Sequence, residues 1–406
     1  MTIRETIDAN WQDELHFLRA LVRSPSDNPP GDCTASAELA ARHLERLGFT
    51  VEEYPVPAEL VEAAGMKSVT NLIVRKTFGA GGPVIALNAH GDVVPPGNGW
   101  TVDPYGAVEK DGALYGRGVA VSKSDFATYA FALKALEANP AGLNGTVELH
   151  FTYDEEAGGM IGPKWLLDQK LTRPTLAISA GFSYAITTAH NGVLHLEVTV
   201  RGKQAHAAMP FTGADALEAS VPVLAAIYGE RKRLAGIVSK EKGIGSPQIT
   251  VGLISGGINT NVVPDKVTFR IDRRIVPDED GAAVEKALVA LIEQALPIKP
   301  RITVECRRIM LAEPLRPLPG VDRMVTAIQR HAKNVLGVAV EPTGVPLYTD
   351  ARHYAAAGVP TVLYGAGPRS ILEANAHGAD EHLLLTDLRA ATEVIAFTLA
   401  ELLKPV

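Results

Sequence analysis

The sequence predicts an α/β protein: a central, mostly parallel sheet flanked by helices, with a smaller ferredoxin-like α+β domain inserted into it. Three observations support this class. Short apolar runs alternate with segments of helical periodicity over residues 1–192, which is typical of a sheet covered by helices on both faces. From residue 193 the strands instead alternate apolar and polar residues. Beyond residue 310 the first pattern resumes, so we expect a discontinuous larger domain, 1–192 and 310–406, around an insertion at 193–309.

The expected elements of the larger domain follow in chain order. Before the insertion, we expect helices at 5–24, 36–47, 122–136 and 163–167, and strands at 50–55, 69–76, 84–89, 145–152 and 176–179. After it come a helix at 321–336, a strand at 360–364 and a closing helix at 386–403. A polar loop rich in Gly and Pro, residues 95–113, is long enough to line a cleft.

The inserted domain has its own order of elements. Its first strand carries Leu194, Leu196, Val198 and Val200 on one face, and more polar residues on the other. A helix at 214–235, strands at 248–254 and 266–275, a helix at 282–296 and a strand at 301–309 follow. This is the split β-α-β order of a ferredoxin-like sandwich.

Composition excludes several classes of function. The chain has 406 residues, 46% of them hydrophobic, which is enough for two cores. Its net charge of -7 is scattered and no basic run occurs, which argues against nucleic acid as a partner. We find neither a signal-peptide core nor an uncharged spanning run, so we expect no membrane partner and a cytoplasmic location. Cys33 and Cys306 lie far apart and are interpreted as structural thiols.

The strand at 84–89 delivers a histidine and an aspartate to its end. Alternation in an extended chain puts His90 and Asp92 on the same side. The Asp92 carboxylate is then expected to accept the second N–H of the imidazole and to fix which ring nitrogen faces a metal. The pattern alone also fits a core histidine at the end of a strand.

A second strand ends at Asp154-Glu155-Glu156, and a third candidate, His377, lies in a polar loop near the C-terminus. Adjacent carboxylates repel one another, so a fold is expected to keep them for a cation or for proton transfer. Two histidines and one carboxylate can hold a hydrolytic metal with an open position, and a second glutamate can take the proton of a water there. A solvated acidic turn is the alternative interpretation of this motif by itself.

The ordered motifs of the chain resemble those of the zinc-dependent amidohydrolases that include acetylornithine deacetylase, succinyl-diaminopimelate desuccinylase, aminoacylase and glutamate carboxypeptidase. The resemblance covers nearly the whole chain. It is carried by His90–Pro95, Gly99-Trp100 with Asp103-Pro104, Leu114–Gly118, Asp154–Glu156 with Gly158-Gly159, Gly202 with His206, Asn261–Pro264, Thr349–Arg352 and Ala376-His377. It implies a catalytic domain with a lid domain that usually forms the contact in a homodimer.

The resemblance also implies roles for single residues. His90, Glu156 and His377 match metal ligands, Asp92 the aspartate that orients His90, and Glu155 the general base. His206 resembles the lid histidine that stabilises the oxyanion, in dimeric relatives in the other subunit's site. The candidates for binding the substrate are Asn261, Arg274 as a carboxylate clamp, Arg352 and Gly367.

Two metal-ligand positions of the family are missing from this chain. Val121 stands where relatives carry a metal-bridging aspartate, and Ala180 stands where they carry an acidic ligand. Both losses fall on the same ion, so we expect one Zn²⁺ per subunit, with Mn²⁺ or Co²⁺ as alternatives, held by Glu156, His377 and either His90 or water. Asp125 lies one helical turn after Val121, about 5.4 Å away, too far to replace a bridge without moving the helix.

These observations predict a metal-dependent hydrolase of a C–N bond, amide or related, in a small substrate that carries a carboxylate. Two alternatives remain open from the sequence. One is a catalytically inactive relative that binds a small molecule, and the other is a metal-independent acid–base enzyme such as a lyase or deaminase. Retention of Glu155 argues against the first, because a binding protein has no evident need for a general base.

Overall fold

The computed structural model describes residues 1–370 and 372–405 and divides the chain into two compact units. Unit 1 comprises Met1–Thr188, Pro317–Thr343 and Thr349–Val406, and unit 2 comprises Ala189–Arg316 and Gly344–Tyr348. The sequence prediction put the insertion at 193–309, and unit 2 extends a few residues further at each end. The predicted fold class, a large α/β sheet domain with a smaller α+β domain, is confirmed.

The large sheet of unit 1 has parallel strands at its centre. Its strand order is β1 (Val51–Pro55), β2 (Thr70–Phe78), β6 (Gly145–Thr152), β3 (Val84–His90), β7 (Leu176–Ser179), β14 (Thr361–Leu363), β8 (Ile186–His190) and β13 (Pro342–Val345). Strand β3 runs parallel to β6 and β7, and β7 runs parallel to β14. His90 is paired with Thr152, so the ends of β3 and β6 lie at the same edge of the sheet.

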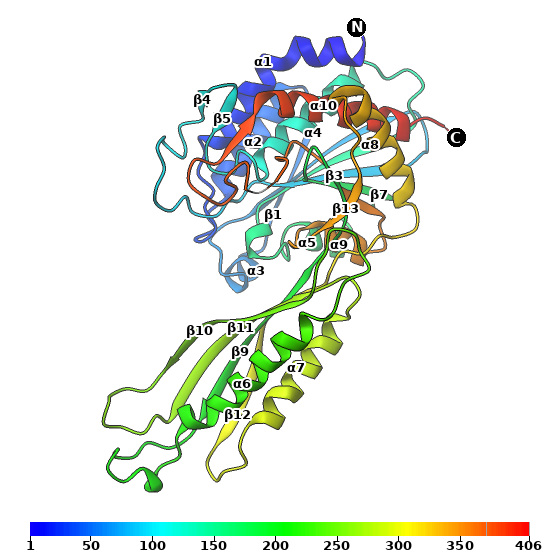
Figure 1. Cartoon of the computed structure of the whole chain (residues 1–406). Helices are drawn as coiled ribbons and strands as arrows, with labels where there is room; N and C mark the ends of the chain where they lie inside the picture. The colour runs from blue at the N-terminus through cyan, green and yellow to red at the C-terminus, as the bar shows by residue number, and fades with distance from the viewer. Residues whose placement is uncertain (371, 406) are drawn as a thin grey trace. The chain divides into compact units, whose positions relative to one another are not determined.

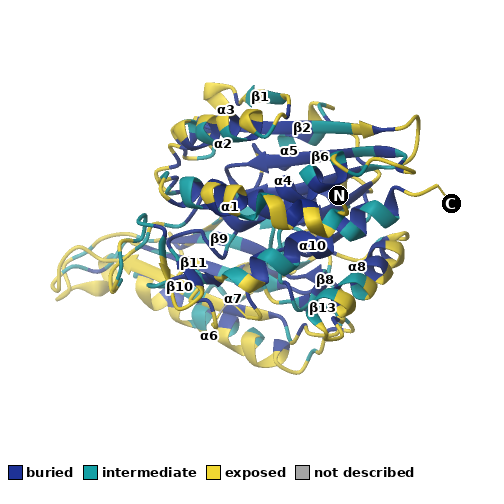
Figure 2. Cartoon of the chain, turned by 90° about the horizontal axis from the view of Figure 1, so that it is seen from above, coloured by how far each residue is buried: buried dark blue, intermediate teal, exposed yellow. Residues whose placement is uncertain are grey.

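Helices cover both faces of this sheet (Figure 1). One layer consists of α1 (Ile3–Val22), α2 (Thr34–Arg46), α4 (Lys123–Glu137), α8 (Val321–Leu336) and α10 (Leu385–Leu402). The short helices α5 (Pro163–Asp168) and α9 (Ala351–Ala356) pack together on the other face. Helix α4 is almost entirely buried (Figure 2), and so is strand β3, as expected for a strand covered on both faces and for the helix packed on it.

The end of the loop at 95–113 forms regular structure that the sequence analysis missed. Strands β4 (Val108–Lys110) and β5 (Ala113–Tyr115) pair antiparallel, and β15 (His382–Leu384) pairs with β5. The turn between β4 and β5 is Asp111-Gly112, and both residues have positive φ, 52° and 76°. Asp-Gly is a standard hairpin signal, so this pair was readable from the sequence. A short helix α3 (Ala58–Ala63) follows β1.

Unit 2 is the ferredoxin-like sandwich that the sequence predicts. Its elements are β9 (Gly192–Arg201), α6 (Ala216–Leu234), β10 (Gln248–Gly256), β11 (Lys266–Ile275), α7 (Gly281–Ala295) and β12 (Thr303–Ala312). The sheet order β10-β11-β9-β12 is antiparallel throughout, and β10 lies at one edge. Leu194, Leu196, Val198 and Val200 of β9 are buried, as their alternation predicts. Asp215 and Asp280 cap the N-termini of α6 and α7.

In residues 1–370 and 372–405, none of the helices combines the length and apolar character needed to cross a membrane.

Candidate active site

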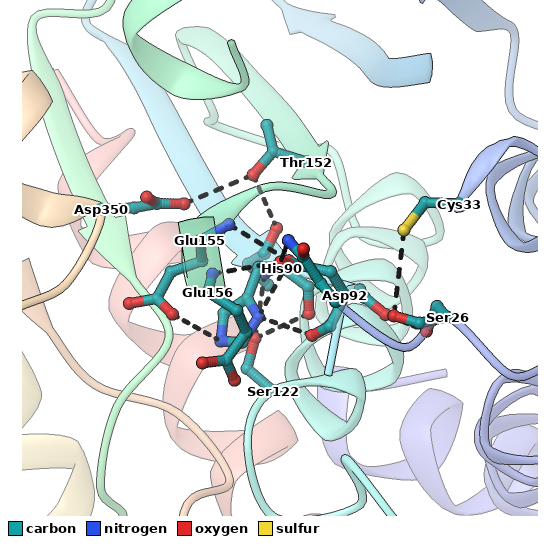
Figure 3. Close-up of polar contacts among 12 residues, drawn as sticks. Ser26, Cys33, His90, Asp92, Ser122, Thr152, Glu155, Glu156 and Asp350 are labelled. Atoms are coloured by element: carbon teal, nitrogen blue, oxygen red, sulfur yellow. Dashed lines mark hydrogen bonds and ion pairs between the residues drawn. The ribbon is translucent and has the colours of Figure 1, made fainter. Parts of the chain in front are cut away.

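The side chain of Ser122 fixes the backbone of His90 at the end of β3 (Figure 3). The hydroxyl of Ser122, just before α4, accepts the His90 amide N–H at 2.9 Å and donates to the His90 carbonyl at 3.0 Å. The side chain of His90 is 7% exposed. Because one hydroxyl satisfies both backbone groups, the strand ends here and the imidazole is presented at the edge of the sheet.

The ring of His90 turns Nε2 towards the acidic residues. Its Nδ1 lies 3.0 Å from the Asp92 carbonyl oxygen and 3.4 Å from the Asp92 carboxylate. The shorter contact is therefore with the backbone of Asp92, where the sequence analysis expected the carboxylate. Either acceptor places a proton on Nδ1 and leaves Nε2, 3.9 Å from Glu155 Oε2, to meet a cation.

The Asp92 carboxylate also holds the acidic segment in place. It is fully buried, and it accepts the backbone N–H groups of Glu155 at 3.2 Å and Glu156 at 3.1 Å. These two residues begin the short 3-10 turn η1 (Glu155–Ala157) that follows β6. Asp92 thus connects the end of β3 to the base and the metal ligand predicted from the sequence.

The structure brings the three predicted metal ligands, His90, Glu156 and His377, together with the predicted base, Glu155. His90, Glu155 and Glu156 each offer one ligand atom, and these atoms all lie within 4.8 Å of one another. His377 joins through Glu156, with its Nε2 3.1 Å from Glu156 Oε1. Glu155 and Glu156 are 14% and 10% exposed, whereas His377 is 52% exposed. Imidazole nitrogens and carboxylate oxygens are the ligand types that bind divalent cations such as Zn²⁺, so this group could hold a metal ion.

Burial and mutual repulsion shift the ionisation of this cluster. Burial, with a contribution from Glu156, raises the pKa of Glu155 to about 7. Although burial opposes its charged form, the neighbouring carboxylates, Glu155 foremost, raise the pKa of His90 well above its usual value. The hydrogen bond to Glu156 raises the pKa of His377. A carboxylate with a pKa near neutrality, beside a cation site, is suited to accept a proton from water.

Two polar side chains that follow Val121 in the chain, Lys123 and Asp125, are bonded to backbone groups of the protein. Asp125, the nearest acidic residue after Val121, accepts the backbone N–H of Ala366 at 2.7 Å, and its carboxylate is not part of the His90 cluster. Lys123 is fully buried and donates to the carbonyls of Leu21 at 3.0 Å and Ser24 at 2.9 Å. Neither side chain supplies the missing ligand in this arrangement.

Glu381, four residues after His377, is a site residue that was not predicted from the sequence. Its carboxylate bonds Arg117 at 2.6 Å and accepts the backbone N–H of Ala120 at 2.9 Å. Glu381 and Arg117 are each 1% exposed. The sequence shows Arg117 between two glycines but not that it is buried, and only a buried guanidinium requires an acidic partner. This pair fixes the loop that contains Val121.

Asp350 was also missed as a site residue. It is buried, and its Oδ2 lies 3.5 Å from the Thr152 hydroxyl (Figure 3). Burial, followed by Glu155 and Asp154, raises the pKa of Asp350 well above its usual value. Its oxygen would lie 2.0 Å from a Cβ at Gly159, where φ is +67°, so this close approach requires a glycine at position 159.

Two predicted substrate residues of unit 1 contact backbone. Arg352 is buried in α9, and its guanidinium donates to the Gly158 carbonyl just after η1. Gly367 donates its N–H to Gly181 at 2.9 Å, and a Cβ there would lie 2.5 Å from that carbonyl oxygen. Their contact with a substrate stays a prediction.

In unit 2 the structure places His206 beside Asn261. The Ala207 N–H donates to the Asn261 carbonyl at 3.0 Å, and His206 forms a β-bridge with Val262. The His206 Nδ1 accepts the Ala208 N–H at 3.0 Å, so in the neutral ring Nε2 carries the proton and is a donor. Arg274 lies elsewhere on the sheet, with its Nε 2.9 Å from Asp272, which also bonds His195.

Comparison with known proteins agrees with this geometry. The chain is 27% identical to succinyl-diaminopimelate desuccinylase of Acidiphilium cryptum over 94% of this chain and 96% of the relative. It is 29% identical to acetylornithine deacetylase of Myxococcus xanthus over 89% and 90%. Among solved structures, the YXEP protein of Bacillus subtilis superposes with a TM-score of 0.71 at 16% identity, covering 98% of this chain and 100% of that one.

A family model identifies the group to which these relatives belong. Residues 86–401, which include every candidate residue discussed above, match the model described as peptidase family M20/M25/M40. The relatives are named hydrolases, and the family acts on C–N bonds with the help of metal ions, as the cluster of His90, Glu155 and Glu156 leads one to expect. The chain is a metal-dependent hydrolase that belongs to peptidase family M20/M25/M40.

Proposed function

We propose that this protein hydrolyses the amide bond of a small N-acyl amino acid or related carboxylate-bearing molecule, with one divalent cation per subunit. The observation that carries the proposal is the Glu155 carboxylate, 3.9 Å from His90 Nε2, inside a group of ligand atoms that fits a single ion. The two similar relatives are named a desuccinylase and a deacetylase, which supports an acyl group on nitrogen as the substrate class.

The proposed roles follow from the contacts of each side chain. A divalent cation held by His90, Glu156 and His377 would polarise the scissile carbonyl and acidify a water molecule. Glu155, whose carboxylate lies 3.9 Å from His90 Nε2 beside the ligand atoms, is placed to take a proton from a water molecule and to pass it to the leaving nitrogen. Asp92 keeps Glu155 and Glu156 in position through their backbone N–H groups.

The remaining roles are proposed for the residues outside the cluster. The Nε2–H of His206 is suited to stabilise an oxyanion, because its Nδ1 is occupied by the Ala208 N–H. Asn261, Arg274, Arg352 and Gly367 remain the proposed substrate contacts. Arg274 keeps donors beyond those directed at Asp272, since only its Nε and Nη2 are used there.

A single ion is proposed because Val121 and Ala180 offer no ligand atom where the family pattern has acidic residues. The YXEP protein is described as a dinuclear metal-binding peptidase, so the proposed difference lies within one fold. We expect Zn²⁺, with Mn²⁺ or Co²⁺ as alternatives, because carboxylate and imidazole ligands accept all three. We also propose a cytoplasmic location.

The experiment that tests the proposal combines metal content with turnover. Protein purified without chelator is expected to hold about one ion per chain by elemental analysis, and Glu156→Ala to hold none. Glu155→Gln is expected to keep the ion and to lose roughly a thousandfold in kcat on a panel of N-acetyl and N-succinyl amino acids. The matched control is Glu59→Gln, at an exposed position in α3.

Three results would contradict the proposal. Two ions per chain would mean that other residues replace Val121 and Ala180. Unchanged turnover in Glu155→Gln would remove the base from the mechanism. Equal turnover of amides with and without a free carboxylate would exclude the proposed substrate class.

A further inference from the structure

The site has a buried neighbour to which no role has been given above, Asn28. It lies in the segment between α1 and α2, and only 7% of the residue is exposed. Its side-chain Nδ2 lies 2.9 Å from Asp92 Oδ2 and donates to it. Asp92 is the carboxylate that accepts the backbone N–H groups of Glu155 and Glu156, so Asn28 contacts the residue that supports the cluster.

Each carboxylate oxygen of Asp92 has two of these partners. Oδ1 accepts the Glu155 N–H at 3.2 Å and lies 3.4 Å from His90 Nδ1. Oδ2 accepts the Glu156 N–H at 3.1 Å and the Asn28 side chain. Of these contacts at 2.9 to 3.4 Å, that of Asn28 is the shortest. A carboxylate with this many donors has a single orientation, and Asn28 supplies the only side-chain amide among them.

The segment that carries Asn28 is itself fixed to the end of β3. The backbone N–H of Asn28 donates to Val93 at 2.8 Å, and the Val93 N–H donates to Ser26 at 3.0 Å. The Ser26 hydroxyl, labelled in Figure 3, donates to the Gly91 carbonyl at 2.6 Å. Asn28 therefore approaches Asp92 from a backbone that cannot shift without breaking the pairing to residues 91–93.

The chemistry of an amide suits this position. The amide donates a hydrogen bond to a buried anion but adds no charge, so the cluster keeps the negative charge that a cation needs. Removing the donor leaves a buried carboxylate oxygen with fewer partners, which costs more than the bond itself contributes. The Glu156 backbone shares that oxygen, so the disturbance reaches the metal ligand.

We infer that Asn28 is a positioning residue: through Asp92 it fixes the backbone of Glu155 and Glu156, and so sets both the affinity for the divalent cation and the placement of the base. The part of this inference that concerns turnover rests on the proposed function. The part that concerns the Glu155–Glu156 segment does not.

The test uses Asn28→Ala, which removes the donor, and Asn28→Asp, which keeps the shape but replaces the donor with an acceptor. Zn²⁺ affinity of the full chain is measured by competition with a chromogenic chelator, and amide hydrogen exchange is followed in peptides covering 152–160. Asn139→Asp is the matched control, because Asn139 Nδ2 also donates at 2.8 Å, but to a helix carbonyl at the end of α4.

We expect both Asn28 variants to bind Zn²⁺ about tenfold or more weakly, in the range seen when groups supporting metal ligands are removed. Exchange is expected to accelerate at 152–160 but not in the rest of unit 1, and kcat to fall while KM stays within about twofold. Asn139→Asp is expected to leave all three unchanged.

Other outcomes separate this inference from the proposed function. Uniformly faster exchange with unchanged Zn²⁺ affinity would mean a purely structural role and would overturn the inference. If the parent protein binds no Zn²⁺, the proposed function fails, and the exchange at 152–160 alone then decides for or against Asn28. Weakened Zn²⁺ binding without turnover of any N-acyl amino acid would support the inference and contradict the proposed substrate class.

Discussion

Glu14 is a buried carboxylate far from the acidic cluster in sequence and in its contacts. It lies in α1, fully buried, and accepts the Thr392 hydroxyl from α10 at 2.5 Å with one oxygen. Its other oxygen has no hydrogen-bond partner among the described residues. Burial raises the pKa of Glu14 to about 8. The folded protein therefore keeps a proton on Glu14 at pH values where the unfolded chain has released it.

This shift predicts how stability depends on pH. Because the folded pKa is raised, the contribution of Glu14 is fully present below about pH 4.5 and is lost as pH rises towards 8. Glu14→Gln mimics the protonated form, so we expect it to stabilise the protein by a few kcal/mol at pH 8 and by almost nothing at pH 4.5. Urea unfolding of both proteins at the two pH values measures this.

The control for Glu14 is Asp13→Asn, an exposed neighbour on the same helix. It is expected to change the free energy of unfolding by less than about 0.5 kcal/mol at either pH. A Glu14→Gln variant that is equally stabilised at both pH values would show that packing, not ionisation, governs this position.

At the scale of elements, the loop 116–122 before α4 depends on a buried ion pair. Arg117 donates to Glu381 at 2.6 Å and to the carbonyls of Pro96 and Gly378, at 3.1 and 3.0 Å. We expect Glu381→Gln to lower the free energy of unfolding by about 3–5 kcal/mol, because it leaves a buried guanidinium without a counter-charge. Guanidinium-chloride unfolding monitored by circular dichroism measures the loss.

Two further variants test this prediction, one as a control and one as a rescue. Glu230→Gln breaks the pair of Arg233 and Glu230 on α6, where Arg233 is 63% exposed, and is expected to cost less than about 1 kcal/mol. The double variant Arg117→Met, Glu381→Leu is expected to recover much of the loss, since it leaves no buried charge. A loss in Glu381→Gln no larger than that in Glu230→Gln would contradict the role given to the pair.

The parts of the site that sequence predicts are those set by local pattern. The apolar runs of β3 and β6 identify two buried strands, and polar residues at their ends mark His90 and Glu155. His90 and Glu155 are adjacent because the neighbouring parallel strands β3 and β6 end at the same edge of the sheet. Glu381 was not found, since its partner Arg117 lies 264 residues away and no local pattern specifies that distance. The same holds for Asn28, which is 64 residues from Asp92.

At the scale of the whole molecule, unit 2 carries exposed apolar side chains on one helix face. Leu217, Val221 and Tyr228 of α6 are 48%, 58% and 43% exposed, and their spacing puts them on one stripe. Helix α6 packs on the edge strand β10, where Leu253 and Ile254 are 61% and 56% exposed. An exposed edge strand beside an apolar stripe is typical of a surface that pairs with another chain.

We expect this surface to form the contact of a homodimer, the assembly that the sequence analysis predicts. A two-fold axis beside β10 would pair the edge strands of two copies and bring their α6 stripes together, as a self-complementary contact requires. Val221→Glu places a charge at the centre of the stripe, so we expect a dimer to become a monomer. Light scattering after size exclusion measures the mass, against 43.1 kDa for one chain.

Val238→Glu is the matched control, because Val238 is 77% exposed but lies beyond the end of α6. It introduces the same charge and is expected to leave the dimer intact. A monomeric parent protein would contradict the prediction, and a dimer that survives Val221→Glu would place the contact on another surface. If His206 acts in the other subunit's site, Val221→Glu is also expected to lose turnover to about the level of His206→Ala, whereas a dimer needed only for stability would leave the monomer's kcat unchanged.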